Sequence, residues 1–105
     1  ATVEGGSAWQ THFQLVQPML GAVVVKDFTW RVAPNGGGGQ IGWCPVGKGM
    51  VDRRFFRMLR AMEWRGPVTL HFEYPVPGAT RAEKNASWVK AMAEDTRVLR
   101  ELLGV

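Results

Sequence analysis

The order of two strand-like segments around a helix-like segment constrains the fold of this chain most. Residues 22–28 (AVVVKDF) and 68–74 (VTLHFEY) have strand-forming composition, and residues 52–64 between them carry apolar side chains at helical spacing. Residues 65–67 (RGP) alone separate that helix from the second strand, whereas a long segment follows each strand. A β–α–β order of this kind predicts two parallel strands with both long segments at one end.

Helical periodicity marks two further segments, residues 7–17 and about 87–103. Ser7 and Asp52 are expected to cap the first and middle helices, and Gly104 to end the last one. The inner faces of the first two helices are expected to carry Trp9, Phe13, Phe55, Leu59 and Met62. The predicted order is therefore α–β–α–β–α.

Two parallel strands are rarely stable without further partners, so we expect several strands upstream. Short loops before the strands and long loops after them, here residues 29–51, are typical of (β/α)8 barrels, whose active sites lie on the loops after the strands. The predicted fold is α/β: the C-terminal portion of a TIM barrel, with two parallel strands and three helices in one partial domain over residues 1–105. A self-sufficient α/β domain is the alternative.

Composition narrows the function classes. The chain has 105 residues, of which 46% are hydrophobic, and a formal charge of +4, which is ordinary for a globular protein. The arginines within residues 53–65 favour a solvated helix face over a nucleic-acid surface. No apolar run is long enough to span a membrane, and Cys44 is the single cysteine, which excludes an intramolecular disulfide. We expect a cytoplasmic protein, with assembly into a homo-oligomer left open.

The second strand has an unusual polar face. Thr69, His71 and Glu73 alternate with apolar residues, so in a barrel they point inward, and Glu73 lies nearest the mouth. A carboxylate there must be paired, solvated or bound to a cation. Glu73 is therefore either a metal ligand and acid–base group or the partner of a neighbouring cation such as Lys26. His71 suits a structural role as well as a functional one.

Lys26 and Asp27 end the first strand. An inward Lys26 offers an ammonium to a substrate oxygen or phosphate, or to Glu73. Asp27 is expected to turn toward the following loop and to accept backbone N–H bonds there. Residues 42–49 (GWCPVGKG) approach the phosphate-loop pattern, but the last position lacks the magnesium-binding hydroxyl, so we reject a nucleotide site.

In combination, these motifs resemble the sugar phosphate isomerase/epimerase superfamily, the xylose isomerase-like TIM barrels. The resemblance rests on VVVKDF at 23–28, WCPVGKGMVD at 43–52, GPVTLHFEYP at 66–75 and a closing helix that ends VLRELLG. It implies that the two strands are the seventh and eighth of a barrel and that EGG at 4–6 follows the sixth.

The resemblance also implies an activity. Members interconvert sugars or sugar-like polyols by proton transfer beside a carbonyl, with Mn²⁺, Mg²⁺, Co²⁺ or Zn²⁺ at the barrel mouth. Glu73 matches the eighth-strand glutamate that binds the metal and acts as catalytic base, and Lys26 is the second expected catalytic residue. The residues expected to bind the sugar are His71, Trp30 and Lys48. Because other ligands would come from upstream strands, this chain alone is expected to be inactive.

Two positions depart from the family pattern. Val24 stands where many relatives carry a histidine near the metal, and Lys48 stands where they commonly carry an acid. These departures favour a non-catalytic sugar-binding barrel as one alternative. A metal-dependent apurinic endonuclease is another, but it would be expected to bring several histidine ligands, and the chain has only His12 and His71. Nucleic acid is therefore not the expected partner.

Overall fold

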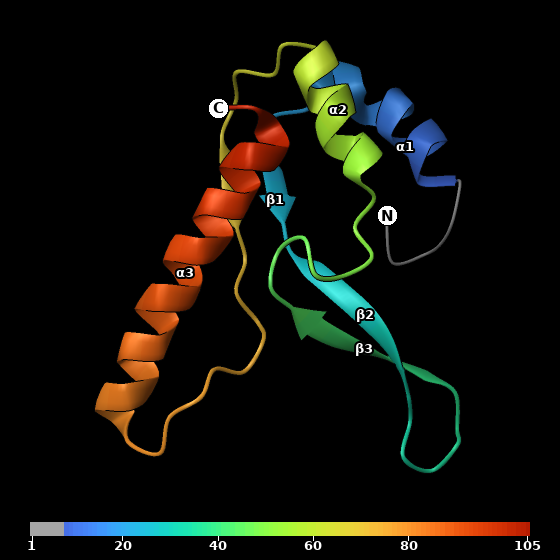
Figure 1. Ribbon diagram of the computed structural model, residues 1–105. Helices are drawn as coiled ribbons and strands as arrows, with labels where there is room; N and C mark the ends of the chain where they lie inside the picture. The colour runs from blue at the N-terminus through green and yellow to red at the C-terminus, as the bar shows by residue number, and fades with distance from the viewer. Residues whose placement is uncertain (1–7) are drawn as a thin grey trace.

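The computed structural model describes residues 8–105, which adopt a mixed α/β fold (Figure 1). The helices are α1 (Ala8–Val16), the short 3-10 helix η1 (Gln17–Met19), α2 (Arg53–Ala61) and α3 (Arg81–Leu103), and the strands are β1 (Val23–Val25), β2 (Asp27–Val32), β3 (Gly39–Cys44) and β4 (Val68–Leu70). Strands β1 and β4 pair in parallel, and β2 and β3 form a separate antiparallel hairpin. The expected Ser7 cap and the EGG segment lie outside the described residues.

The parallel pairing of β1 with β4 confirms the predicted β–α–β arrangement. Val23 lies opposite Val68 and Val25 opposite Leu70, and all four of these side chains pack in the hydrophobic core. The intervening residue Val24 is 63% exposed. The pair therefore buries one face, which α2 and α3 cover, and leaves the other face open.

The core lies where the parallel pair meets α2 and α3. Leu59 of α2 is fully buried and Leu99 of α3 nearly so. The expected inner stripe of α2 is right for Leu59, but Phe56 is buried more deeply than Phe55. Phe55 instead meets Phe13 of α1 edge-on, with ring centroids 5.2 Å apart, and so joins the first two helices.

Residues 29–51 are not the plain loop that we expected, because they contain most of the β2–β3 hairpin. Trp30 lies opposite Ile41 in its register, and Val32 opposite Gly39. The turn between the strands includes Gly36 and Gly38, both at positive φ, a conformation that glycine adopts at little cost. The predicted order omitted this hairpin.

Helix α3 begins at Arg81, six residues before the expected start at Ser87. Thr80 accepts a hydrogen bond from the Glu83 backbone N–H, and the Glu83 carboxylate accepts one from the Thr80 N–H. This capping box starts the helix. The predicted ending is confirmed, since Gly104 adopts a left-handed φ of 73°. Strand β4 ends at Leu70, before the expected residue 74.

A buried carboxylate on α3 holds two connecting segments against that helix. Asp95 is 2% exposed; it accepts a hydrogen bond from the Tyr74 hydroxyl at 2.8 Å and one from the Val46 backbone N–H at 3.2 Å. Burial raises the pKa of Asp95, whereas the bond from Tyr74 opposes that rise. The pKa of Tyr74 is also raised, first by burial and then by its bond to Asp95.

We predict that Tyr74→Phe lowers the free energy of unfolding by about 1–3 kcal/mol at pH 7, because it removes a donor from a buried carboxylate. Because the pKa of Asp95 is raised in the folded protein, its contribution to stability is fully present below the unfolded pKa of about 4. That contribution is lost as pH rises through the folded pKa. Removing the Tyr74 donor raises the pKa of Asp95 further and so increases this loss. The cost of Tyr74→Phe should therefore be smaller at pH 4 than at pH 7 in urea unfolding.

The matched control is the same change in an Asp95→Asn background. With no carboxylate to titrate, the cost of Tyr74→Phe should not vary between the two pH values. An equal pH dependence in both backgrounds would contradict the assignment to Asp95.

Candidate active site

The open face of the parallel pair carries the polar residues that the sequence placed there. Val24 lies opposite Thr69 in the register, and both side chains are exposed. The same alternation continues beyond the strand ends, because the His71 N–H still donates to the Val25 carbonyl at 2.9 Å. Lys26, His71 and Glu73 therefore follow Val24 and Thr69 on one face.

Lys26, His71 and Glu73 come together at the carboxyl end of this face. The Lys26 ammonium donates to Glu73 Oε1 at 3.1 Å, and His71 Nδ1 lies 3.1 Å from the same oxygen. About a third of the Lys26 and Glu73 side chains is exposed. The structure thus contains the Lys26–Glu73 ion pair, which was one of the two interpretations of Glu73.

Trp43 of β3 completes this cluster, and sequence reasoning missed it. The Lys26 Nζ lies 3.9 Å from the centroid of the Trp43 ring, a cation–π contact. The hairpin register pairs Trp43 with Phe28 near the start of β2, and this places Trp43 close to Lys26. Only knowledge of the hairpin could have revealed this contact, because Lys26 and Trp43 are far apart in the sequence.

Asp27 has the predicted role of holding the following loop. Its side chain is buried, and its carboxylate accepts backbone N–H bonds at 2.9–3.0 Å from Phe28, Gly47, Gly49 and Val51. A Cβ at Gly49 would lie within 2.3 Å of Asp27 Oδ1, so glycine permits this close approach. The Gly47 and Gly49 amides thus bind an internal carboxylate, while the Lys48 N–H donates to the Pro45 carbonyl at 3.0 Å.

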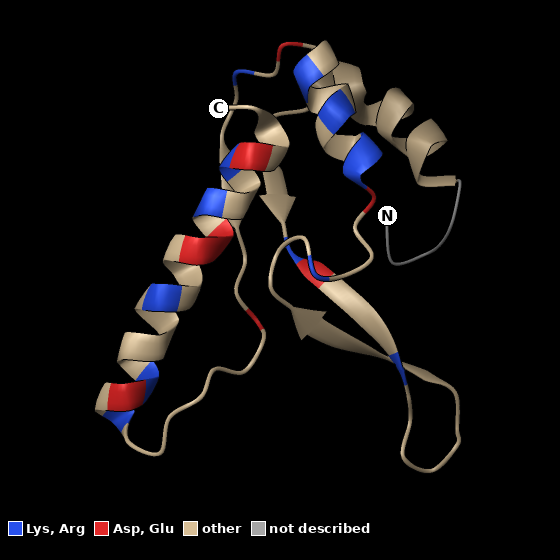
Figure 2. Ribbon diagram, viewed as in Figure 1, with Lys and Arg blue, Asp and Glu red and all other residues tan. Residues whose placement is uncertain are grey.

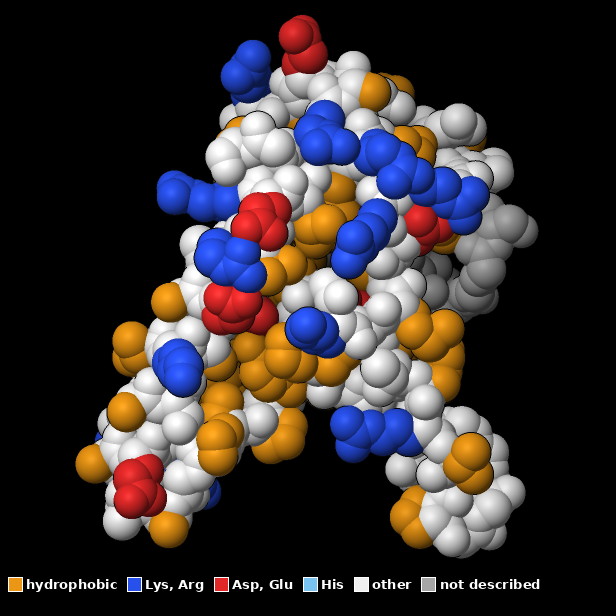
Figure 3. Space-filling model, in the orientation of Figure 1, with side chains coloured by type: hydrophobic (Ala, Val, Ile, Leu, Met, Phe, Trp, Pro, Cys, Tyr) orange, Lys and Arg blue, Asp and Glu red, His pale blue; other side chains and the backbone are white. Residues whose placement is uncertain are grey.

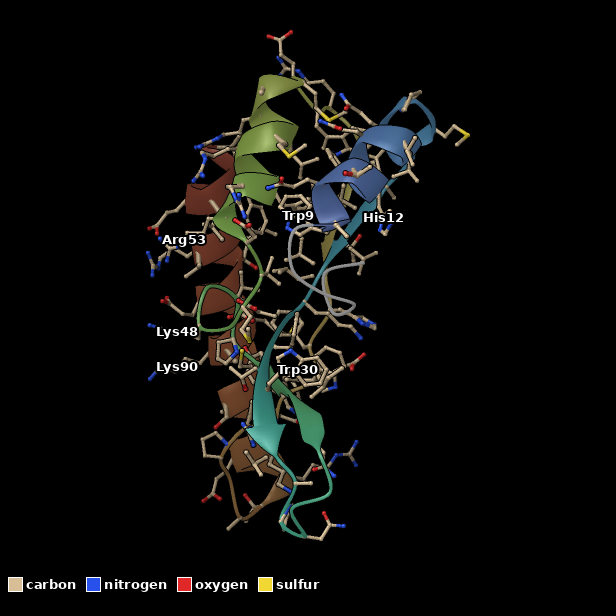
Figure 4. The ribbon with its side chains drawn as sticks, turned by 90° about the vertical axis from the view of Figure 1, so that its right-hand side faces the viewer. Trp9, His12, Trp30, Lys48, Arg53 and Lys90 are labelled. Carbon is tan, nitrogen blue, oxygen red and sulfur yellow. The ribbon has the colours of Figure 1, made fainter. Side chains whose placement is uncertain are left out.

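The remaining predicted site residues lie on two sides of the molecule. Figure 4 shows Trp30 and His12 on one side of the ribbon and Lys48 on the other, where Lys90 also projects. Lys48 is exposed and lies near Glu94 of α3. The pKa of Glu94 is lowered mainly by its hydrogen bond with Arg97 and to a smaller extent by the charge of Lys48. The structure does not bring Lys48 to the cluster of Lys26, His71 and Glu73.

A cavity of about 320 Å³ adjoins the cluster between α1 and β1. Trp9, Phe13 and Val24 line it with other apolar side chains, and His12 and Lys26 supply its polar groups. His12 is exposed, as expected for the polar side of the first helix. The cavity thus places apolar side chains next to Lys26, beside the charged cluster.

Positive charge gathers away from this cluster. Figure 2 shows α2 with basic residues and no acidic ones, while α3 mixes both signs. The α2 arginines are Arg53, Arg54, Arg57 and Arg60, and all are exposed; basic side chains cover this part of the surface in Figure 3. Arg53 projects on the side of Lys48 in Figure 4. The arrangement agrees with a solvated helix face.

The site offers part of the donor set that a divalent cation requires. Glu73 supplies a carboxylate and His71 an imidazole nitrogen, both ligands for Mn²⁺, Co²⁺ and Zn²⁺, while the Lys26 ammonium competes for the same carboxylate oxygen. Within residues 8–105, no three His, Cys, Asp or Glu side chains form a metal-binding group. The donor chemistry of Glu73 and His71 would therefore fit only part of a metal site.

Comparisons of the chain with protein-family models, with curated proteins and with solved structures find no match. None of the helices in the part of the chain that the structure describes has the length and apolar character needed to cross a bilayer.

We predict that Asp27→Asn destabilises the protein by about 2–4 kcal/mol, since the amide group places a donor against backbone donors in a buried position. Urea unfolding at pH 7 measures the change. Asp52→Asn is the matched control: Asp52 caps α2 by accepting from the Arg54 N–H, and asparagine caps helices equally well. Equal stability of the two variants would contradict the role assigned to Asp27.

Proposed function

We propose that this chain is the C-terminal portion of a (β/α)8 barrel and that the complete barrel is a metal-dependent sugar or sugar phosphate isomerase or epimerase. The observation that carries the proposal is the open strand face with Lys26, His71 and Glu73 at its carboxyl end. In (β/α) barrels, catalytic residues lie at this end of the strands.

One edge of β1 has no partner strand among residues 8–105, which supports a larger sheet. Val23 N and Val25 O bond toward β4, so the backbone groups of Val24 point to the opposite edge. Apolar side chains also remain exposed on the neighbouring helices, namely Leu15, Val16 and Met19. A further strand along β1 would pair the edge and cover this apolar surface, which a two-stranded sheet cannot do alone.

The cluster supports proton transfer beside a carbonyl. In an isomerisation, the Glu73 carboxylate would take a proton from the carbon next to the sugar carbonyl and return it to the carbonyl carbon, while the proton of the adjacent hydroxyl moves to the carbonyl oxygen. The Lys26 ammonium would hold a substrate oxygen, and His71 would keep Glu73 in place through their contact. Glu73 and His71 would hold the divalent cation, which when bound supplies polarisation of the carbonyl.

A non-catalytic sugar-binding barrel is the second candidate, and the Lys26–Glu73 pair favours it. In this arrangement the carboxylate oxygen nearest His71 already accepts a hydrogen bond from Lys26. If Glu73 stays paired with Lys26, the two charged groups would bind sugar hydroxyls, but Glu73 would not accept a proton from the sugar. The two candidates differ in whether turnover and a metal requirement accompany binding.

We predict that Glu73→Gln lowers kcat for ketose isomerisation or epimerisation by about 10²–10⁴-fold, the range expected for loss of a general base. The measurement uses the intact protein that contains this chain, with turnover lost in EDTA and restored by Mn²⁺. Glu63→Gln is the matched control, because Glu63 is an exposed glutamate at the end of α2 and should leave kcat unchanged.

Two outcomes would contradict the leading proposal. Unchanged turnover in Glu73→Gln would remove the assigned catalytic role. Sugar binding with neither turnover nor any effect of EDTA would establish the non-catalytic barrel instead.

A further inference from the structure

The β2–β3 hairpin has one apolar face. Its register pairs Phe28 with Trp43 and Trp30 with Ile41, and places Val32 one step further along the same face. The opposite face carries the polar Thr29, Arg31 and Gln40 together with Asp27 and Cys44. Phe28 is buried at the base of the apolar face, whereas Trp30 is 48% exposed and Val32 83% exposed.

This apolar face begins at the charged cluster. Trp43 lies under the Lys26 ammonium, and the same ammonium bonds to Glu73. Trp30 and Trp43 are diagonal neighbours on the same face, a spacing that two aromatic side chains can bridge. The face therefore continues the site outward from Lys26 along the hairpin.

Trp30 packs beside a position of β3 that has no side chain. A Cβ at Gly39 would lie 3.3 Å from Cε3 of Trp30, so glycine leaves room for the indole there. Trp30 nevertheless remains 48% exposed. Phe28 meets Trp30 edge-on, with centroids 6.1 Å apart, and supports it from the base.

The apolar face is longer than one sugar ring. From Phe28 to Val32 a strand extends over roughly 14 Å, while the charged groups lie only at the base. A monosaccharide that reaches Lys26 and Glu73 would leave Trp30 and Val32 uncovered. Sugar rings present C–H groups that pack on the electron-rich face of an indole, and their hydroxyls bond to charged groups beside it.

We propose that the apolar hairpin face, centred on Trp30, binds a second ring of the substrate, so that the site takes a disaccharide whose reacting ring keeps its free carbonyl in preference to a monosaccharide. The reacting sugar then lies against Lys26 and Glu73, and the attached ring stacks on Trp30. This inference rests on the proposed function, because it extends the same site.

Calorimetry on the intact protein tests the inference with D-fructose and with lactulose, a ketose disaccharide. Lactulose should bind about tenfold more tightly than D-fructose. Trp30→Ala should remove that difference and leave the affinity for D-fructose within about twofold of the original. Trp30→Phe, which retains an aromatic face, should restore most of the preference for lactulose.

The outcomes separate this inference from the proposed function. Equal affinities for the two sugars, together with turnover that still depends on Glu73, overturn the second-ring site alone. Binding of neither sugar overturns the second-ring site, and the proposed function is then decided by the turnover of Glu73→Gln alone. If Trp30→Ala changes the oligomeric mass in light scattering while both affinities stay the same, the hairpin face is a contact between copies and the inference is wrong.

Discussion

The hydrogen bonds of the Asp27 carboxylate are the interaction on which the rest of the site depends. They fold residues 47–51 back onto the end of β1, and the Met50 N–H adds a bond to the Phe28 carbonyl at 2.8 Å. A buried carboxylate is costly without such donors, and bonds from N–H groups to a charged acceptor are among the stronger ones in proteins. Because Lys26 directly precedes Asp27, this anchor also determines where the ammonium can reach.

Asp95 acts on the same loop from the other side. It binds the Val46 N–H, so residues 46–51 are held between two buried carboxylates that belong to β2 and α3. The oxygens of both carboxylates accept hydrogen bonds from the protein itself. Glu73 differs from them, since it lies partly exposed on the open face. Of these three carboxylates, Glu73 is therefore the one that a ligand could reach.

Local patterns predicted the parts of the structure that local forces determine. Alternation along residues 68–73 predicted the open face, Asp52 was identified as a helix cap, and Asp27 was assigned to the loop. The Thr80–Glu83 capping box was also readable but was overlooked. In contrast, the contacts of Trp43 with Lys26 and of Tyr74 with Asp95 depend on hairpin register and on packing between distant segments, which no local pattern contains. Membership in a barrel stays a prediction.

The adjacent residues Lys26 and Asp27 differ in how firmly their side chains are held. Asp27 is buried with backbone partners, so its position changes only if the loop unfolds. The Lys26–Glu73 pair is about one-third exposed, and ion pairs at such positions contribute roughly 0–1 kcal/mol. A polar atom of a ligand could therefore displace it at little cost. If upstream strands enclose the site, the lower local polarity strengthens the Lys26–Glu73 pair. A ligand must then offer an acceptor to Lys26 and a donor to Glu73 at the same time. Such a site selects for molecules that carry a donor and an acceptor on neighbouring atoms.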